Sequence, residues 1–181
     1  MPSFLSRTCC ITENWRCRIV PVTYTYLEAP IGPLLIAGDE SAVRRIFFAK
    51  RGKAAKPEAG WTESVRGPTG AAARQLREYF AGRRIDFDFP LALEGTVFQR
   101  AVWEQLREIP YAETISYGEL ARRVRNPKAA RAVGSANGAN LLPIVIPCHR
   151  VIAGDGTLGG FGGGLAVKQA LLDLEQRVRS I

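Results

Sequence analysis

Alternating apolar and polar positions predict β-structure in the first part of the chain. Residues 22–26 alternate valine and tyrosine with threonine, and apolar runs at residues 34–37 and 42–49 have the length of strands. The Pro- and Gly-containing segment 29–33 predicts a turn, and short turns favour antiparallel pairing. Residues 50–70 are rich in Lys, Gly and Pro, and we expect a mobile connection there.

One helix and one more strand are predicted before the pattern changes. Residues 71–81 carry apolar side chains at helical spacing, and Gly82 follows as a helix stop. Residues 85–89 alternate apolar with acidic side chains, which predicts a half-buried strand that ends at Pro90. Beyond Pro90 the period becomes helical, so a domain boundary is expected near residues 90–95.

Two capping boxes mark helix starts in the second part of the chain. Thr96 and Gln99 have the spacing at which a hydroxyl and an amide satisfy each other's exposed backbone donors, and the helix they open ends at Pro110. Ser116 and Glu119 repeat this spacing and open a second helix.

A third helix completes a helix-turn-helix pattern. Asn126 and Pro127 break the second helix, and residues 128–139 are expected to form the third. This helix is rich in Ala, Gly and Ser and carries one central arginine, Arg131. Helices that read the major groove usually carry several long polar side chains, so we expect minor-groove or non-specific docking.

These elements predict an α+β fold in three parts. Residues 1–21 show no clear period and are interpreted as an N-terminal extension, residues 22–93 as a small domain of antiparallel sheet plus helix, and residues 94–181 as a helical domain. A chain of 181 residues can bury roughly two-thirds of its unfolded surface, so its core needs no disulfide or metal.

Charge and composition narrow the choice of partner and compartment. The net charge is +8, and residues 120–154 contain no acidic residue, so this stretch can face phosphates without local repulsion. No run approaches the roughly 18 apolar residues of a membrane-spanning helix, and residues 1–17 lack the apolar core of a secretion signal. Four cysteines without such a signal favour a reducing compartment, so a cytoplasmic protein is expected.

Residues with reactive potential are concentrated around Cys148. Residues 144–152 are expected to form a buried apolar strand, in which the only histidine of the chain, His149, follows Cys148. A buried cysteine is usually a small apolar core residue, but a neighbouring imidazole and guanidinium favour the thiolate, which is the nucleophile. A carboxylate that orients His149 is sought on the last helix, at Glu175 or Asp173.

A glycine-rich segment follows the cysteine. Residues 154–164 contain seven of the 18 glycines, which allows close backbone approach, and we interpret the segment as the wall or lid of a pocket. It lacks the lysine and the spacing of a P-loop, so no nucleotide cofactor is expected.

Residues 126–134, Asn140 and the Pro-Cys-His-Arg-Val sequence at residues 147–151 resemble the O6-alkylguanine-DNA alkyltransferase family. The resemblance covers about residues 96–175, and residues 29–34 are similar to the opening hairpin of bacterial members. It implies a ribonuclease H-like N-terminal domain and a winged helix-turn-helix-like C-terminal domain.

The resemblance also implies a repair reaction that each molecule performs once. A monomer without cofactor binds double-stranded DNA in the minor groove, flips out O6-alkylguanine, with O4-alkylthymine as a further candidate, and keeps the alkyl group. Carried over by motif, Cys148 is the acceptor, His149 the water-mediated base and Glu175 the residue that orients it, while Asn140 braces the turn before Cys148. Flipping is required because the O6 substituent lies within the base stack.

The family pattern implies further roles in DNA and base binding. Arg131 would fill the hole in the base stack, and Tyr117 would push the phosphate and bond the flipped base. The implied DNA-binding residues are Tyr117, Gly118, Asn126, Arg131 and Arg150. The implied pocket residues are Tyr117, Val151, Phe161 and Gly162, with Phe161 at a position where some members have tyrosine.

No metal site is expected. Zinc-binding members use cysteines and histidines of the N-terminal half, where this chain has no histidine. Cys9, Cys10 and Cys17 are too loosely spaced to indicate a site by themselves.

Two other functions use some of the same residues. A thiol hydrolase also needs a cysteine, a histidine and a carboxylate, but it turns over and has no use for a basic helix that fits a groove. A non-catalytic lesion sensor or regulator keeps the helix-turn-helix, but such sensors lack the acceptor cysteine that Cys148 provides. The alkyltransferase is therefore the function that we expect.

Overall fold

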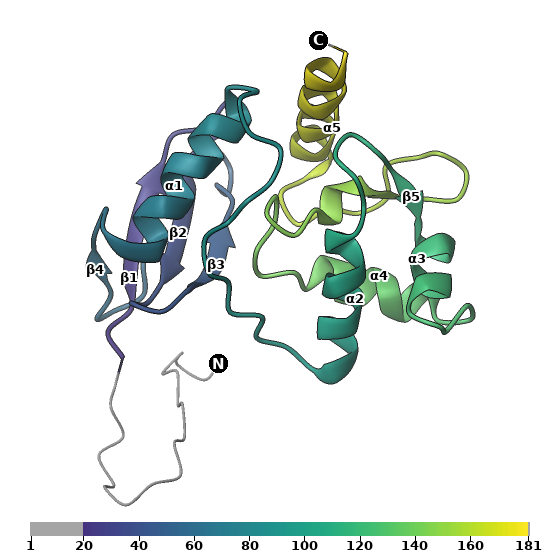
Figure 1. Ribbon diagram of the computed structural model, residues 1–181, viewed down its shortest axis with the longest axis horizontal. Coiled ribbons are helices and arrows are strands. Elements are labelled where there is room, and N and C mark those ends of the chain that lie inside the picture. The colour runs from purple at the N-terminus through teal and green to yellow at the C-terminus, as the bar shows by residue number, and fades with distance from the viewer. Residues whose placement is uncertain (1–19, 181) are drawn as a thin grey trace, which may run out of the picture.

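The computed structural model describes residues 20–180, which form two domains side by side (Figure 1). The elements of the N-terminal domain are β1 (Thr23–Leu27), β2 (Leu34–Gly38), β3 (Val43–Phe47), β4 (Thr62–Glu63) and α1 (Gly67–Phe80). The three predicted strands are present as β1 to β3. They pair antiparallel within a sheet of order β3-β2-β1-β4.

β4 lies where the sequence predicts a mobile connection. Thr62 and Glu63 pair parallel with Thr23 and Tyr24 of β1, so the sheet is mixed rather than purely antiparallel. A strand of two residues is too short to produce a detectable alternation, which is why the sequence pattern misses it.

α1 covers one face of the sheet (Figure 1). It starts earlier than predicted, at Gly67, with Pro68 in its first turn, where a missing N–H leaves no bond unmade. Its inward face buries Ala72, Leu76 and Tyr79 against the sheet and the neighbouring domain.

Residues 85–89 do not form the predicted strand. The N–H of Asp88 donates to the side-chain oxygen of Gln75 on α1 at 3.1 Å, so the segment is tied to the helix. Ile85 is 56% exposed. The chain joins the edge of the sheet only afterwards, where the N–H of Val43 donates to the carbonyl of Pro90 at 2.9 Å.

The C-terminal domain is helical with one small parallel sheet. Its elements are α2 (Val97–Arg107), β5 (Ile115–Ser116), α3 (Tyr117–Arg123), α4 (Ala130–Gly138), the 3-10 helix η1 (Cys148–Arg150), β6 (Val151–Ile152) and α5 (Leu165–Arg179). β5 pairs with β6, and α3 and α4 are the two short helices joined by a turn. The predicted α+β fold class is confirmed.

Both predicted capping boxes lie at helix starts, but only one is reciprocal. At α2 the Thr96 hydroxyl accepts the Gln99 N–H, and the Gln99 side chain accepts the Thr96 N–H. At α3 the Ser116 hydroxyl accepts the Glu119 N–H. The Glu119 carboxylate pairs instead with two arginines of the following turn.

Residues 144–152 are largely buried, as predicted, but they are not a continuous strand. Ile144 has a φ of +76°, and the N–H of Cys148 donates to the carbonyl of Ile146 at 2.7 Å, so the chain turns into η1. Within this segment β6 is the one strand, and Ile146 forms an isolated bridge with Pro143. The turn changes the direction in which the side chains after Pro147 project.

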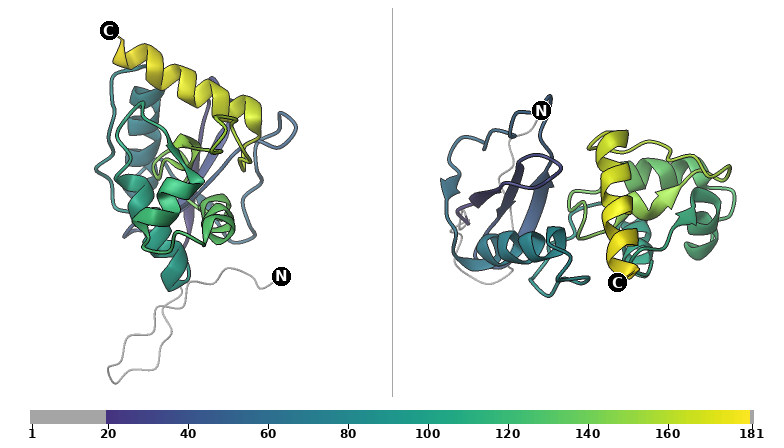
Figure 2. Two further views of the ribbon diagram at one scale, coloured as in Figure 1. Left: turned by 90° about the vertical axis from the view of Figure 1, so that its right-hand side faces the viewer. Right: turned by 90° about the horizontal axis from the view of Figure 1, so that it is seen from above.

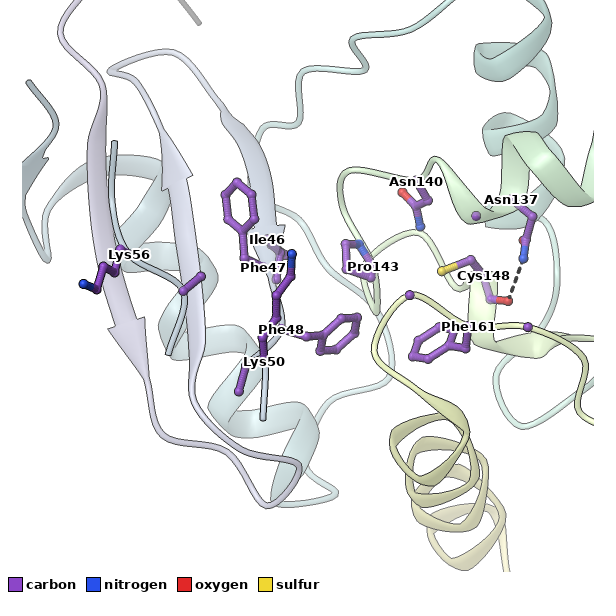
Figure 3. Close-up of a pocket in the computed structure, with 15 residues that line it drawn as sticks. Ile46, Phe47, Phe48, Lys50, Lys56, Asn137, Asn140, Pro143, Cys148 and Phe161 are labelled. Carbon is purple, nitrogen blue, oxygen red and sulfur yellow. Dashed lines mark hydrogen bonds between the residues drawn. The ribbon is translucent and has the colours of Figure 1, made fainter. Parts of the chain in front are cut away.

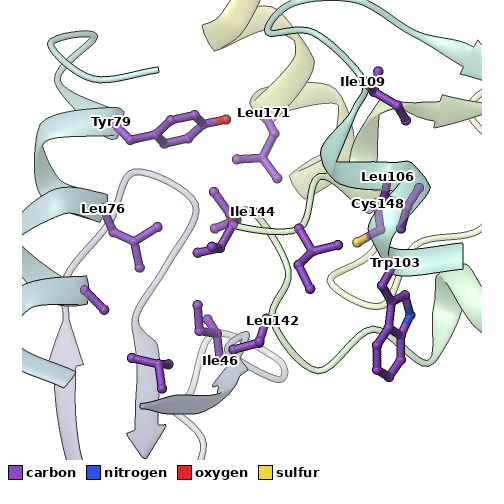
Figure 4. Packing of buried hydrophobic residues seen from close by; sticks show 14 of the residues in the cluster. Ile46, Leu76, Tyr79, Trp103, Leu106, Ile109, Leu142, Ile144, Cys148 and Leu171 are labelled. Carbon is purple, nitrogen blue, oxygen red and sulfur yellow. The ribbon is translucent and has the colours of Figure 1, made fainter. Parts of the chain in front are cut away.

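The two domains share one apolar core (Figure 4). Tyr79 of α1 lies near Leu171 of α5 and Ile144, and Figure 2 shows α5 on the side of its domain that faces the N-terminal domain. The N–H of Ile46 in β3 donates to the carbonyl of Leu141 at 2.9 Å. The segment that leads to Cys148 is therefore fixed to the N-terminal sheet. Within residues 20–180, no helix has the length and apolar character needed to cross a membrane.

Candidate active site

Cys148 begins η1, and only 5% of its surface is exposed. The turn before it is held by Asn140, whose Nδ2 donates to the carbonyl of Ile146 at 2.8 Å. The Oδ1 of the same side chain accepts the N–H of Leu142 at 2.9 Å. Asn140 thus fixes the chain between the end of α4 and the cysteine, and the sulfur points toward a cavity (Figure 3).

Asn137 is a second amide beside the cysteine, and no sequence pattern reveals its role. It lies in α4 with 3% of its surface exposed, and its Nδ2 donates to the carbonyl oxygen of Cys148 at 3.4 Å (Figure 3). Its Oδ1 is buried without a hydrogen-bond partner among the described residues. Asn137 therefore ties the helix of the predicted DNA-binding motif to the backbone of the cysteine.

His149 and Glu175 form a fully buried pair next to the cysteine. Nε2 of His149 lies 2.8 Å from Oε1 of Glu175, which α5 supplies. Asp173, the other candidate carboxylate, is exposed and accepts a hydrogen bond from Gln169 on the same helix. Of the two carboxylates, Glu175 is therefore the one that can orient the imidazole.

Glu175 accepts hydrogen bonds from both domains. Its Oε1 accepts the hydroxyl of Tyr79 at 2.8 Å, and its Oε2 accepts the N–H of Ala112 at 3.0 Å. Arg150 donates to both oxygens at 2.9 Å. Burial alone would raise the pKa of Glu175, but the hydrogen bonds from His149 and Arg150 outweigh it and lower the pKa to about 2.

The ionised Glu175 determines the tautomer of His149. Burial lowers the pKa of His149 below its ordinary value, and the bond to Glu175 opposes this only in part, so the imidazole is neutral near pH 7. Because an ionised carboxylate can only accept hydrogen bonds, Nε2 carries the ring proton. Nδ1 then holds the free lone pair, and it has no hydrogen-bond partner within residues 20–180.

The thiol of Cys148 is protonated in this resting site. Burial raises its pKa to about 11, although the Asn140 amide and the Lys168 ammonium lower it in part. Lys168 is fully buried, and its Nζ donates to the carbonyl of Val151 at 2.5 Å and to that of Leu158. Nucleophilic chemistry at Cys148 therefore requires a base.

Two hollows meet beside Cys148. The first, here called the acceptor cavity, has a volume of about 420 Å³ and is lined by residues of both domains, among them Phe48, Pro143, Cys148, Phe161 and Gly162 (Figure 3). The second, here called the α4 groove, has a volume of about 540 Å³ and is lined by Tyr117, Ala130, Arg131, Gly134 and Ser135. Both hollows are also lined by Asn137, Gly138 and Gly160.

Four of the predicted DNA-binding residues lie on one side of the C-terminal domain. Arg131 on α4 and Asn126 in the turn before it are exposed, and Gly118 is partly exposed in the first turn of α3. Tyr117 is half-buried, and its hydroxyl lies 3.5 Å from the carbonyl oxygen of Gly160. Tyr117 and Arg131 line the α4 groove, whereas Gly118 lies on α3 and Asn126 in the turn between α3 and α4.

Arg150 was expected to bind DNA, and the structure contradicts this. It is 7% exposed, and besides its two bonds to Glu175 it donates through Nη1 to the carbonyl of Ile109 at 2.7 Å. Its guanidinium lies 5.4 Å from the ring centre of Tyr111. The guanidinium is directed inward, because it neutralises the buried carboxylate that orients His149.

The predicted pocket residues do not all line the same hollow. Phe161 and Gly162 line the acceptor cavity, and Tyr117 lines the α4 groove. The side chain of Val151 is fully buried, and β6 pairs it with Ile115, so this side chain lines neither hollow and the pocket role of Val151 stays a prediction. Val151 belongs to the core that supports η1.

No metal centre is visible in the described part of the chain. Residues 20–180 contain no group of three or more His, Cys, Asp or Glu side chains that could hold an ion. Cys9, Cys10 and Cys17 lie outside the described residues, so the expected absence of a metal stays a prediction.

Two family descriptions match the chain. Residues 22–93 match "6-O-methylguanine DNA methyltransferase, ribonuclease-like domain", and residues 97–177 match the DNA binding domain of the same family. The methylated-DNA–protein-cysteine methyltransferase of Methanosarcina acetivorans is 49% identical over 152 residues, covering 84% of this chain and 97% of that protein. That of Mycolicibacterium paratuberculosis is 47% identical over 156 residues, covering 86% and 93%.

Solved structures of O6-methylguanine methyltransferases are also similar to this chain. The crystal structure of Mycobacterium tuberculosis O6-methylguanine methyltransferase has a TM-score of 0.78 and 45% identity, and the alignment covers 86% of this chain and 93% of that one. A crystal structure from the same organism in complex with DNA has a TM-score of 0.78 and 44% identity, covering 86% and 94%. With both of its domains matched and with this identity to curated relatives, the chain belongs to the 6-O-methylguanine DNA methyltransferase family.

Proposed function

We propose that this protein repairs O6-alkylguanine in double-stranded DNA by transferring the alkyl group to its own Cys148, once per molecule. The observation that carries the proposal is the position of Cys148 in the lining of the acceptor cavity, adjacent to a buried His149–Glu175 pair. A lesion sensor without chemistry would need neither the thiol nor the His149–Glu175 pair, here called the relay.

DNA binding is assigned to the face that carries α3 and α4. Arg131 is exposed in the first turn of α4, a helix of small residues, so it can enter the minor groove and occupy the space of an extruded base. The flipped base would enter the α4 groove beside Tyr117, whose hydroxyl is oriented toward Gly160. A related protein has been crystallised in complex with DNA, which supports this choice of partner.

The proton of the thiol is assigned to His149. A water molecule would carry it from Sγ of Cys148 to Nδ1 of the neutral imidazole, and Glu175 would stabilise the imidazolium that forms. Sγ then bonds to the alkyl carbon while the bond from that carbon to O6 breaks. The electron pair leaves with the guanine, which takes up one proton, so the products are a thioether and guanine.

The reaction ends with the thioether. A thiolate bound to carbon as a thioether is a poor leaving group, so the alkyl group stays on Cys148. We propose that one monomer acts on one lesion without a cofactor, because a single chain supplies the acceptor, the base and its orienting carboxylate. The proposed compartment is the cytoplasm, where a reducing environment keeps thiols free.

The proposal is tested by following a radiolabelled methyl group from duplex DNA to protein. The unmodified chain should acquire label, while Cys148→Ala should acquire none and still bind the duplex with similar affinity. Label on Cys148→Ala would show that another residue is the acceptor, and loss of DNA binding would show that the variant is misfolded or that Cys148 supports binding.

A further inference from the structure

The acceptor cavity is lined by an aromatic pair that joins the two domains. Phe48 follows β3 in the N-terminal domain, and Phe161 belongs to the glycine-rich segment of the C-terminal domain. Their ring centres are 5.4 Å apart at an interplanar angle of 56°, and Figure 3 shows the two rings directed toward one another. The N-terminal domain thus contributes a side chain to the cavity beside Cys148.

From its position, the aromatic pair would contact the O6 substituent of a flipped guanine rather than the guanine base itself. Tyr117 and Arg131 lie in the α4 groove, on the side from which a flipped base would arrive. Phe48 lies in the other hollow, which also contains Cys148. A base held near Tyr117 with its O6 substituent at Cys148 would direct the remainder of that substituent into the acceptor cavity.

The cavity is larger than a methyl group requires. Its volume of about 420 Å³ lies within the range of small-molecule pockets, which is roughly 300–1,000 Å³. Its lining includes the apolar side chains Ile46, Phe48, Pro143 and Phe161. Size and lining both suit an aralkyl or long alkyl substituent.

Gly163 shows that the aromatic pair is closely fitted. A Cβ atom at this position would lie 2.9 Å from Cδ2 of Phe48 and 3.1 Å from Cε1 of Phe161. Both distances are shorter than ordinary carbon–carbon contacts, so a side chain at residue 163 would displace one of the rings.

We propose that Phe48 is a specificity-determining residue, which forms with Phe161 the wall that contacts bulky apolar O6 substituents. The inference rests on the proposed function, because it assumes alkyl transfer to Cys148. It assigns to the N-terminal domain a direct part in substrate selection. Its contact with the substituent is apolar and aromatic, so its effect should grow with the size of the transferred group.

The test compares second-order rate constants for duplexes that contain O6-benzylguanine or O6-methylguanine. Phe48→Ala should lower the ratio of benzyl to methyl rates by about 3- to 10-fold, the range expected for loss of an aromatic contact. The matched control is Phe80→Ala, which also removes a partly buried phenyl ring of the N-terminal domain but outside the acceptor cavity, and should leave the ratio within about twofold. An unchanged or increased ratio for Phe48→Ala would overturn the inference. If the unmodified chain transferred no methyl group at all, the proposed function would be at fault instead.

A second variant keeps the test decisive if Phe48→Ala is unstable. Gly163→Ala should also lower the benzyl-to-methyl ratio, because its methyl group displaces the rings. Introduced into Phe48→Ala, the same change should have a smaller effect on the ratio, because one of the two obstructing rings is gone. Fully additive effects, or no effect of Gly163→Ala on the ratio, would contradict a shared wall.

Discussion

The hydroxyl of Tyr79 donates a 2.8 Å hydrogen bond to Oε1 of Glu175, the same oxygen that lies 2.8 Å from Nε2 of His149. Tyr79 belongs to α1 of the N-terminal domain, whereas Glu175 and His149 belong to the C-terminal domain. Burial first, and the nearby Glu175 charge second, raise the pKa of Tyr79 well above its ordinary value, so the phenol remains a donor. The relay next to Cys148 is therefore completed only when the two domains are in contact.

Tyr79→Phe removes this contact without removing the ring. We expect the free energy of unfolding to fall by about 1.5–3 kcal/mol, because a buried carboxylate loses a hydrogen bond to a charged group. Methyl transfer should also slow, since the carboxylate is less firmly held. Urea unfolding and single-turnover kinetics measure the two effects.

Tyr26→Phe is the control for this prediction. Its hydroxyl donates to the carbonyl of Ala55 at 3.0 Å, a neutral and only partly buried bond away from the relay. Tyr26→Phe should lower the free energy of unfolding by less than Tyr79→Phe does, and it should leave the rate of methyl transfer unchanged. Equal losses for both variants would show that Tyr79 has no special connection with Glu175.

Acid should destabilise the fold through Glu175. Its folded pKa of about 2 lies below the ordinary value of 4.5, so its contribution to stability is present above pH 4.5 and is lost as the pH falls toward 2. This group alone should lose about 2 kcal/mol between pH 7 and pH 3. The lowered pKa of His149 acts in the same direction below its ordinary 6.5, because the buried imidazole favours the neutral form.

The measurement is the free energy of unfolding in urea at several pH values. Glu175→Gln should be less stable than the unmodified chain at pH 7, and the difference should shrink at pH 3. A difference that stays constant with pH would mean that the carboxylate is not held ionised by its neighbours.

Removing the base should change the pH dependence of transfer. The Cys148 thiol has a pKa of about 11, so without His149 only a small thiolate fraction reacts at neutral pH. His149→Ala should slow methyl transfer by about 10²- to 10⁴-fold at pH 7.5, the range typical of general bases. Its rate should then rise about tenfold per pH unit toward pH 10, as the thiolate fraction does. A His149→Ala rate at pH 7.5 equal to that of the unmodified chain would exclude His149 as the base.

Arg131→Ala should separate base flipping from chemistry. If Arg131 occupies the space of the extruded base, repair in duplex DNA should slow by about tenfold to a hundredfold, since extrusion costs a few kcal/mol. Reaction with free O6-benzylguanine should be nearly unaffected, because a free base has no stack to leave. Lys128→Ala, which removes an exposed cation from the turn before α4, should affect duplex repair much less. Equal loss on both substrates for Arg131→Ala would place the arginine in the fold or the pocket.

The sequence predicts most elements of this fold because their periodicity is long enough to detect. The helices after Thr96 and the strands β1 to β3 are of this kind. Prediction from the sequence fails where a single side-chain hydrogen bond determines the local conformation of the chain. The amide of Gln75 binds residues 85–89 to α1, and the brace of Asn140 turns the chain before Cys148 into η1.

The same limit applies to the site. Cys148 can be predicted as a reactive residue because His149 and Arg150 follow it in the sequence. Glu175 can be predicted from its place in the family pattern. Tyr79 occupies an apolar helix position like any core residue, so nothing local reveals its bond to a carboxylate 96 residues away. Arg150 has the charge of a DNA contact, and only the position of α5 shows that this charge is used internally.

Irreversible methyl transfer to Cys148 is tested most directly by intact-mass spectrometry after the protein is mixed with a duplex that contains O6-methylguanine. With excess duplex, every chain should gain the mass of one methyl group, and peptide mapping should place it on the peptide that contains Cys148. Repair should stop when one lesion per chain has been consumed, because the thioether is not reversed. Repair of several lesions per chain, or a methyl group on Cys9, Cys10 or Cys17, would contradict the assignment of Cys148 as the acceptor.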